Sequence, residues 1–343
     1  MTTDVLALAM SIQQLPAELG RIFYFVVLPI LLLAGVGFLL QRKLGLDMPT
    51  LTRLNFHFVI PALIYFSLLT NPIPADDALK AILFTVAMLV ALAAVTYLAA
   101  CIRKVPRDQR RAMLMTTMFY NSGNYGLPLQ GLAFRPAGLA DWAMGLQIFV
   151  VLVQNFAGFT VGVLLAAGGR KDRHWKQNLL HIAKFPPLYA LAAALITIQL
   201  RTWLGDDAAV VGAALEPFWD VIRYVKEAFL ATALLTLGAQ LALVSGDKGR
   251  YPVRLSVILR LLVGPALGLG LIYLFGLEGV LAQMLLIGTA TPTAVNCMLM
   301  CLEFDNHPDY ATKAVFYSTL VSPVTVTVVI FLARSGLLPG FAI

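Results

Sequence analysis

Charged residues are scarce in this sequence of 343 residues. Only 13% of the residues are Asp, Glu, Lys or Arg, whereas 59% are hydrophobic and the mean hydropathy is +0.82. A soluble globular chain carries about 25% charged residues, so this chain lacks the polar residues that a water-exposed surface needs. The composition excludes an ordinary soluble domain and predicts a membrane protein.

Cysteine is also rare, and Cys101, Cys297 and Cys301 all lie within apolar runs. Such cysteines do not indicate a disulfide framework. Cys297 and Cys301 are one helical turn apart, but no His or carboxylate stands beside them to complete a metal site. Paired carboxylates within apolar runs and an HExxH motif are absent as well. We therefore predict that the chain is not an enzyme and that it needs no cofactor.

Ten apolar runs, bounded by charged or turn residues, are each long enough to provide the ~20 residues that cross a bilayer. The predicted fold class is therefore an all-α membrane protein with ten transmembrane helices. We expect these spans at about 22–40, 50–70, 78–101, 110–134, 142–167, 178–200, 219–244, 253–275, 279–302 and 311–333.

The net charge of +7 does not indicate a nucleic-acid partner, because the basic residues gather in alternate links between the apolar runs. Cytoplasmic links carry an excess of Lys and Arg. We therefore expect a multi-pass protein of the cell (inner) membrane with both termini outside and with four basic cytoplasmic links, at 42–43, 103–111, 170–176 and 248–254. The link with Glu303, Asp305 and Asp309 is cytoplasmic by count, although it is acidic.

Prolines suggest that the two halves of the chain are related. Pro29 and Pro186, and likewise Pro128 and Pro292, are separated by similar intervals. Five spans per half is an odd number, so a duplicated second half enters the membrane from the opposite side, as in many secondary transporters. We expect residues 1–168 to form the first five-helix repeat, 169–176 to form a cytoplasmic link and 177–343 to form the second, inverted repeat.

Polar and turn residues interrupt two of the spans. The fourth contains NSGNYGLPLQG (121–131) and the ninth contains GTATPTAVN (288–296). Pro128 removes a backbone donor and clashes with the preceding turn, so the fourth span should break near it. In hydrocarbon a break is tolerated only where it faces protein or water, and the positive end of the following half-helix can then meet an anion.

Two breaks at matching positions predict a polar site near the middle of the membrane. Gln154 of the fifth span adds an amide that can bind a carboxylate, on the same helix face as Gln147. The candidate substrate-binding residues are Asn121, Ser122, Asn124, Tyr125, Pro128, Gln154, Thr291, Pro292, Thr293 and Asn296. The alternative is that these are proline kinks whose polar side chains bond to neighbouring helices.

Ionisable residues deep in the spans are few. His57 is the candidate for proton coupling, since an imidazole titrates near neutral pH; alternatively it is an interfacial or core-facing histidine. Arg260 and Glu227 lie one or two turns inside their spans, and we expect both to be interfacial. The coupling ion stays open between H⁺ and Na⁺.

Several stretches resemble the auxin efflux carrier family, which includes bacterial malonate and malate permeases. They are VVLPILLLAGVGFLLQRKLGLDMPTLTRLNFHFVIPALIYFSLL, NSGNYGLPLQG, ALLTLGAQLAL and TPTAVNCMLM. The likeness covers nearly the whole chain. It implies a ten-helix inverted-repeat fold similar to that of the bile-acid sodium symporters, in which helices four and nine cross at their prolines, here Pro128 and Pro292.

The resemblance also implies how such a protein works. A scaffold of spans 1, 2, 6 and 7, which usually forms a homodimer, supports a mobile transport domain of spans 3–5 and 8–10 in an elevator mechanism. The long central loop of the plant auxin exporters has no counterpart here, which disfavours auxin. We therefore expect a secondary carrier for a small organic anion, in particular a carboxylate. The alternatives are a sodium-coupled organic anion symporter and a non-transporting membrane sensor or channel.

Overall fold

The computed structural model describes residues 15–167, 186–205, 215–243 and 251–341, and within these ranges the elements are all helical. This confirms the all-α class. The predicted link at 169–176 and the first residues of the sixth predicted span lie outside the described residues. Among the described residues, eight helices are long and apolar enough to cross a membrane: Leu15–Leu44, Met48–Thr70, Ala75–Ile102, Ala140–Ala167, Pro186–Leu204, Glu216–Ala242, Val253–Leu274 and Pro308–Arg334.

Large apolar side chains cover much of the exposed surface of these helices. Trp203, Leu274 and Ile102 are 80%, 74% and 69% exposed, and many other Leu, Val and Phe side chains are exposed as well. Water does not stabilise so much apolar surface, whereas hydrocarbon does. The exposed side chains therefore agree with the composition in indicating a lipid-embedded protein.

Prolines widen the helices instead of ending them. In four places a π-helical turn precedes an α-helix whose second residue is proline. Because proline lacks the N–H and crowds the preceding turn, the residue before it bonds five residues back, as Ile60 does to the Asn55 carbonyl. The turns and prolines are Phe23–Val27 with Pro29, Asn55–Val59 with Pro61, Ser122–Gly126 with Pro128, and Leu259–Val263 with Pro265.

The contacts divide the chain into two compact units. Unit 1 holds the described residues of Met1–Leu32, Leu83–Asn121 and Ser245–Ile343, and unit 2 holds those of Leu33–Ile82 and Ser122–Val244. This division differs from the predicted repeats and from the predicted scaffold and transport domains, and both of those remain predictions.

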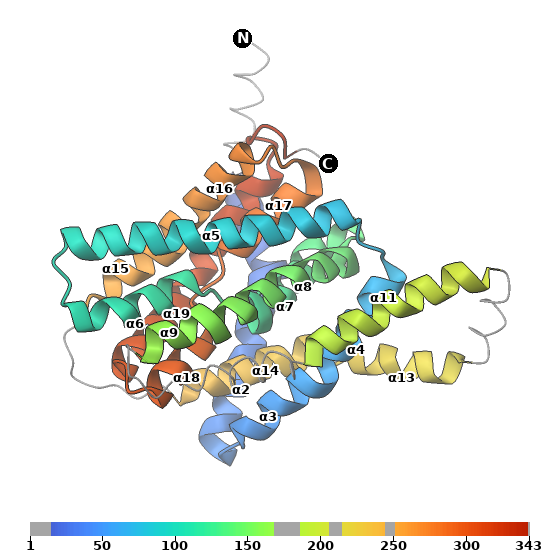
Figure 1. Cartoon of the computed structure of the whole chain (residues 1–343), viewed down its shortest axis with the longest axis horizontal. Helices are drawn as coiled ribbons and strands as arrows, with labels where there is room; N and C mark the ends of the chain where they lie inside the picture. Colours follow the sequence, from blue (N-terminus) through green and yellow to red (C-terminus); the bar gives the residue numbers. More distant parts are fainter. Residues whose placement is uncertain (1–14, 168–185, 206–214, 244–250, 342–343) are drawn as a thin grey trace, which may run out of the picture. The chain divides into compact units, whose positions relative to one another are not determined.

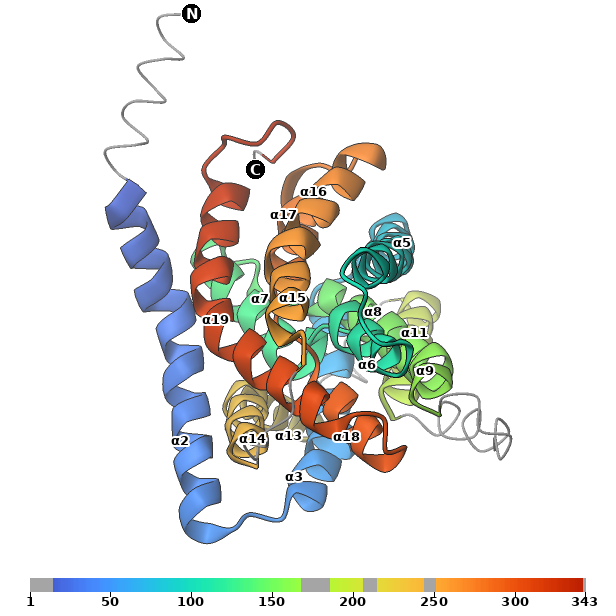
Figure 2. The same ribbon diagram turned by 90° about the vertical axis from the view of Figure 1, so that its left-hand side faces the viewer.

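In unit 1 the long helix α19 is the central element, and shorter helices pack along it (Figure 2). Most of α5 (Ala75–Ile102) also belongs to this unit. The helices that contact α19 are α6 (Arg107–Met118), α15 (Val253–Ile258), α17 (Gly279–Thr289) and α18 (Val295–Glu303), while α16 (Gly264–Leu274) packs on α17 and α19 itself spans Pro308–Arg334.

In unit 2 the helix α4 (Ile60–Thr70) is central, with α11 and α13 packed on it (Figure 1). Its core is aliphatic, as shown by the complete burial of Leu63 and Ala194. The other helices are α3 (Met48–Leu54), α7 (Leu127–Phe134), α8 (Ala140–Ala157), α9 (Val163–Ala167), α11 (Pro186–Leu204), α13 (Glu216–Glu227), α14 (Phe229–Ala242) and most of α2 (Leu28–Leu44).

Helices α2 and α14 of unit 2 approach so closely that their backbones touch. A Cβ atom added at Gly37 would fall 2.1 Å from the Leu235 carbonyl oxygen, and one added at Gly238 would fall 1.8 Å from that of Ala34. Small residues permit such close packing between membrane helices. The glycines therefore set the distance between α2 and α14.

We expect Gly37→Ala to lower the free energy of unfolding by about 3 kcal/mol, because the helices must separate to admit one methyl group. Gly35→Ala is the matched control on the same helix. A Cβ there meets nothing within 4 Å, so it should stabilise the helix by up to about 1 kcal/mol. Thermal unfolding in detergent checks the pair, and equal effects would contradict the close contact.

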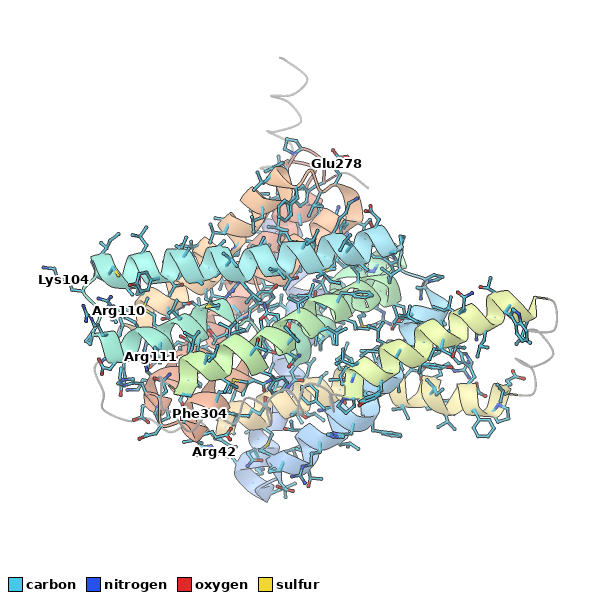
Figure 3. All side chains as sticks on the ribbon, viewed as in Figure 1. Arg42, Lys104, Arg110, Arg111, Glu278 and Phe304 are labelled. Carbon is cyan, nitrogen blue, oxygen red and sulfur yellow. The ribbon has the colours of Figure 1, made fainter. Side chains whose placement is uncertain are left out.

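Three links meet at one end of unit 1. Asp108, at the start of α6, lies 3.2 Å from His307, just before α19. The ring of Tyr251, just before α15, stands 6.0 Å from the His307 ring. Lys104 and Arg111 lie at this same end of α5 and α6 (Figure 3).

The C-terminal segment lies beside a different link of unit 1. The Gly279 N–H donates to the Gly340 carbonyl (2.7 Å), and Gln283 donates to that of Phe341 (2.6 Å). Glu278 is in this link, well away from Lys104 (Figure 3). Within unit 1 the basic α5–α6 link and the link with Glu278 therefore lie at different ends, whereas the acidic link around His307 lies at the basic end (Figure 3).

Candidate functional site

Two interrupted segments of unit 1 pair through their backbones. Helix α6 ends at Met118 and α17 ends at Thr289, and the residues that follow, 119–121 and 290–294, are not helical; we call them the paired breaks. Tyr120 and Thr293 form an antiparallel β-bridge. Two hydrogen bonds complete the pairing. The Asn121 N–H donates to the Pro292 carbonyl (2.7 Å), and the Ala294 N–H donates to the Phe119 carbonyl (3.0 Å).

The pairing solves a problem that any break creates in hydrocarbon. Backbone groups released from a helix need partners, because lipid supplies none. Here each break supplies partners to the other. The break in the fourth predicted span lies at 119–121, several residues before Pro128, which instead sits in the first turn of α7.

The threonines of the second break bond back to the protein. Thr293 donates its hydroxyl to the Thr116 carbonyl (2.7 Å) and its N–H to the Ser318 hydroxyl (3.1 Å). Thr291 donates to the Gly288 carbonyl (2.8 Å). In this conformation the two predicted binding residues Thr291 and Thr293 thus hold the break in place.

Arg260 lies fully buried against the paired breaks, so its expected interfacial position is wrong. Its Nη1 donates to the Thr117 carbonyl (3.1 Å) and its Nη2 donates to the Thr289 carbonyl. The guanidinium carbon stands 4.8 Å from the centre of the Tyr120 ring, in a cation–π arrangement. Sequence reasoning failed to include this residue in the site.

Both carbonyls that Arg260 binds belong to the last turns of broken half-helices. The C-terminal carbonyls of a helix lack intrahelical partners and carry the negative end of its dipole. One guanidinium therefore satisfies the ends of α6 and α17 together. A Cβ atom at Gly264 would fall 2.7 Å from Arg260 Nη2, so the absence of a side chain there leaves room for the cation.

The remaining predicted residues of unit 1 lie at or beside the second half-helix. Asn121 and Pro292 are buried in the paired breaks. Asn296 is half-buried in the first turn of α18, which begins at Val295. The first N–H groups of a helix lack intrahelical acceptors and attract negative charge. The start of α18 therefore offers donors to an anion.

In unit 2 the predicted residues cluster around the π-helical turn Ser122–Gly126. Ser122 and Tyr125 are buried, whereas Asn124 is half-buried. The Gln147 amide of α8 donates to the Ser122 carbonyl (3.1 Å). Gln130 of α7 donates to the Gln147 side-chain oxygen at the longer distance of 3.5 Å. These amides hold the turn against α8.

Gln154 lies two turns further along α8 and differs from Gln147. It is 5% exposed, yet neither its Nε2 nor its Oε1 has a hydrogen-bond partner among the described residues. Buried amides are normally hydrogen-bonded, because burial without a partner is costly. The Gln154 amide is therefore available to a ligand, as its place among the predicted binding residues requires.

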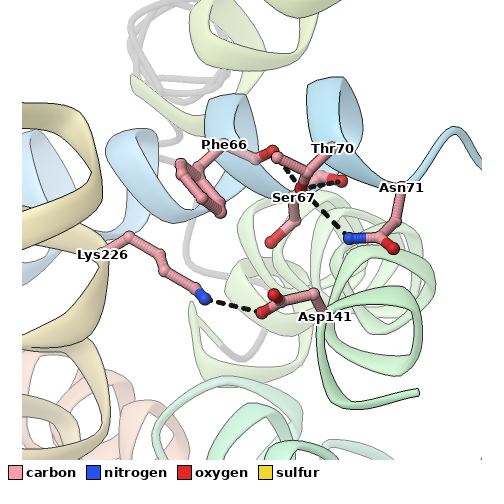
Figure 4. Close-up of polar contacts among 6 residues, drawn as sticks. All are labelled: Phe66, Ser67, Thr70, Asn71, Asp141 and Lys226. Atoms are coloured by element: carbon pink, nitrogen blue, oxygen red, sulfur yellow. Dashed lines mark hydrogen bonds and ion pairs between the residues drawn. The ribbon is translucent and has the colours of Figure 1, made fainter. Parts of the chain in front are cut away.

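An ion pair of unit 2 joins the start of α8 to α13 (Figure 4). Lys226 Nζ lies 2.7 Å from Asp141 Oδ1 and 4.9 Å from the centre of the Phe66 ring. His57 stands apart from these contacts. It is exposed, and its Nδ1 is 3.1 Å from the Arg53 carbonyl oxygen of its own helix.

Long apolar helices together with paired, polar-lined breaks define a polytopic membrane protein with a polar interior, the construction of carriers. The comparison of sequences makes the class specific. This chain belongs to the family described as membrane transport protein, whose profile matches residues 22–330.

Similar proteins agree with this assignment. An uncharacterized transporter of Methanothermobacter thermautotrophicus is 24% identical over 306 residues, which cover 87% of this chain and 94% of that protein. A putative malonate transporter of Rhizobium meliloti is 27% identical over 338 residues, covering 92% and 97%. Auxin efflux carrier component 1 of Arabidopsis thaliana is 26% identical over 161 residues, covering 46% and 24%. The expected resemblance is confirmed, and the chain is a transporter and not an enzyme.

Proposed function

We propose that this protein is a secondary carrier that moves a small organic anion, a carboxylate, across the cell membrane. The observation that supports this most directly is the paired breaks of unit 1. They bring a half-helix start, the half-buried Asn296 and a buried cation, Arg260, into one polar region. Donors at a helix start bind anions.

Malonate is the first substrate to test. The proposal draws on the name of the Rhizobium meliloti relative, a putative malonate transporter, which is similar to this chain over nearly its full length. A dicarboxylate also suits a site that offers amides and backbone donors without a carboxylate of its own.

The proposed architecture is the inverted repeat of ten spans. The two interrupted segments, α6 with α7 and α17 with α18, would then be spans four and nine beside the eight long helices. The placement of Lys104, Arg110 and Arg111 at the end of unit 1 away from Glu278 (Figure 3) supports cytoplasmic placement of the basic end and an outside C-terminus. An elevator motion of spans 3–5 and 8–10 against a dimeric scaffold of spans 1, 2, 6 and 7 completes the proposal.

Uptake of radiolabelled malonate into proteoliposomes tests the function. We expect Asn296→Ala and Asn124→Ala each to reduce uptake about tenfold or more, because a hydrogen bond to a charged ligand contributes about 1.5–3 kcal/mol. Asn155→Ala is the matched control, since that half-buried amide donates to the Val151 carbonyl (2.8 Å) of its own helix. If both variants move a confirmed substrate at the wild-type rate, these residues do not bind it.

A further inference from the structure

The carbonyl groups at the ends of α6 and α17 raise the question of coupling. In many secondary transporters, carbonyls freed where helices break coordinate Na⁺, and this binding couples transport to the sodium gradient. In this chain the Thr117 and Thr289 carbonyls, at the ends of the two half-helices, already bind a cation that is part of the protein.

We infer that Arg260 is a built-in counter-cation that stands where an inorganic coupling ion would bind, so that the paired breaks of the native protein take up no Na⁺. The inference also predicts how a variant without the Arg260 side chain behaves. In that variant the Thr117 and Thr289 carbonyls, at the negative helix ends, form an empty site for a monovalent cation. The consequence for transport rests on the proposed function, whereas cation binding does not.

The charge balance of unit 1 supports this inference. No Asp or Glu in the described part of the chain forms an ion pair with Arg260, so its charge is balanced by helix ends and by the Tyr120 ring. A monovalent cation carries the same charge and binds the same oxygen atoms. The two helix ends can therefore bind either the guanidinium or a monovalent metal ion, but not both at once.

The packing around the Arg260 guanidinium also supports the inference. The glycines at 264 and 268 lie one turn apart on α16, and a Cβ at the second would fall 2.7 Å from the Thr289 side chain. These glycines let α16 approach the end of α17, and they leave a space that the guanidinium fills. We expect truncation of Arg260 to empty that space and to leave the Thr117 and Thr289 carbonyls facing it.

Thermal unfolding of the purified full-length protein in choline chloride, NaCl and KCl tests the inference. We expect the wild type to unfold at the same temperature in all three salts. Arg260→Ala should unfold at a lower temperature in choline chloride. NaCl, KCl or millimolar ethylguanidinium should then raise its Tm by at least about 3 °C, the size of shift expected for a ligand bound well above its Kd.

Arg110→Ala is the matched control in unit 1. Arg110 also donates to a backbone carbonyl, that of Val105 (2.8 Å), but at the end of the α5–α6 hairpin, and we expect no cation response from it. A wild-type Tm that rises in Na⁺ relative to choline would overturn the inference. The inference would also be overturned if Na⁺, K⁺ and ethylguanidinium all left the Tm of Arg260→Ala unchanged. The same holds if Arg260→Ala failed to fold in the presence of each of these cations.

None of these measurements involves transport. If neither malonate nor other small carboxylates are taken up while the thermal pattern holds, the proposed function is wrong and the built-in cation stands. If the wild type takes up malonate but only in the presence of Na⁺, the proposed function stands and the built-in cation is wrong.

Discussion

Ala294→Pro should reduce transport at least tenfold while leaving every other side chain of the paired breaks in place. Ala294 has φ −67° and ψ 134°, values that a proline adopts without strain. Its N–H donates to the buried Phe119 carbonyl at 3.0 Å. The substitution therefore removes one hydrogen bond between the breaks and leaves the buried Phe119 carbonyl with only the distant Cys297 thiol (3.9 Å) as a donor among the described residues.

Loss of that donor should lower the free energy of unfolding by about 1–3 kcal/mol. We expect uptake to fall at least tenfold, because the register of the two breaks places the start of α18. Ala294→Val is the matched control, since it adds as many carbon atoms as proline does and keeps the N–H. Thermal unfolding in detergent and proteoliposome uptake check both variants. If proline and valine behave alike, bulk and not the hydrogen bond explains the effect.

The prolines show what the sequence could predict and where it misled. The Asn, Gly, Thr and Pro residues predict two interruptions, and the helices do stop nearby, at 119–121 and 290–294. Pro128, however, does not end a helix, because it lies in the first turn of α7, directly after the π-helical turn Ser122–Gly126. The preceding helix, α6, ends earlier, at Met118. A proline removes a single backbone bond, which a wider turn accommodates. A full break needs new partners for several backbone groups, and those come from residues 292–294, far away in the sequence.

Arg260 was misplaced for a related reason. Its acceptors are the backbone carbonyls of Thr117 and Thr289, and a carbonyl oxygen is present at every position, so no sequence pattern reveals it. Counting turns from the end of the span suggested an interfacial position. The one local signal is Gly264, a turn after Arg260, because a small residue there leaves room for a large side chain.

Side-chain roles within the breaks were equally hidden. The sequence indicated that Thr291 and Thr293 belong to the polar region, and both are buried there. Their hydroxyls nevertheless bond to backbone carbonyls of unit 1. Whether a threonine binds a ligand or ties down a helix end depends on tertiary contacts, which neither composition nor spacing contains.

Gln154→Leu should make the protein more stable and less active. The Gln154 side chain is buried, and both of its amide atoms lack hydrogen-bond partners in the described ranges. Leucine fills a similar volume without polar atoms, so we expect the free energy of unfolding to rise by about 1–3 kcal/mol. If the amide serves the substrate, malonate uptake should fall at least tenfold in the same variant.

Gln147→Leu is the control that shows whether any leucine at a buried position of α8 would stabilise the protein. Gln147 lies on the same face, two turns earlier, but its amide is bonded to the Ser122 carbonyl (3.1 Å). Its replacement should therefore lower the free energy of unfolding, opposite in sign to Gln154→Leu. Thermal unfolding in detergent measures both signs, and uptake is measured on the same preparations. A loss of stability in Gln154→Leu would mean that its amide has a partner in the fold, and unchanged uptake would remove Gln154 from the proposed site.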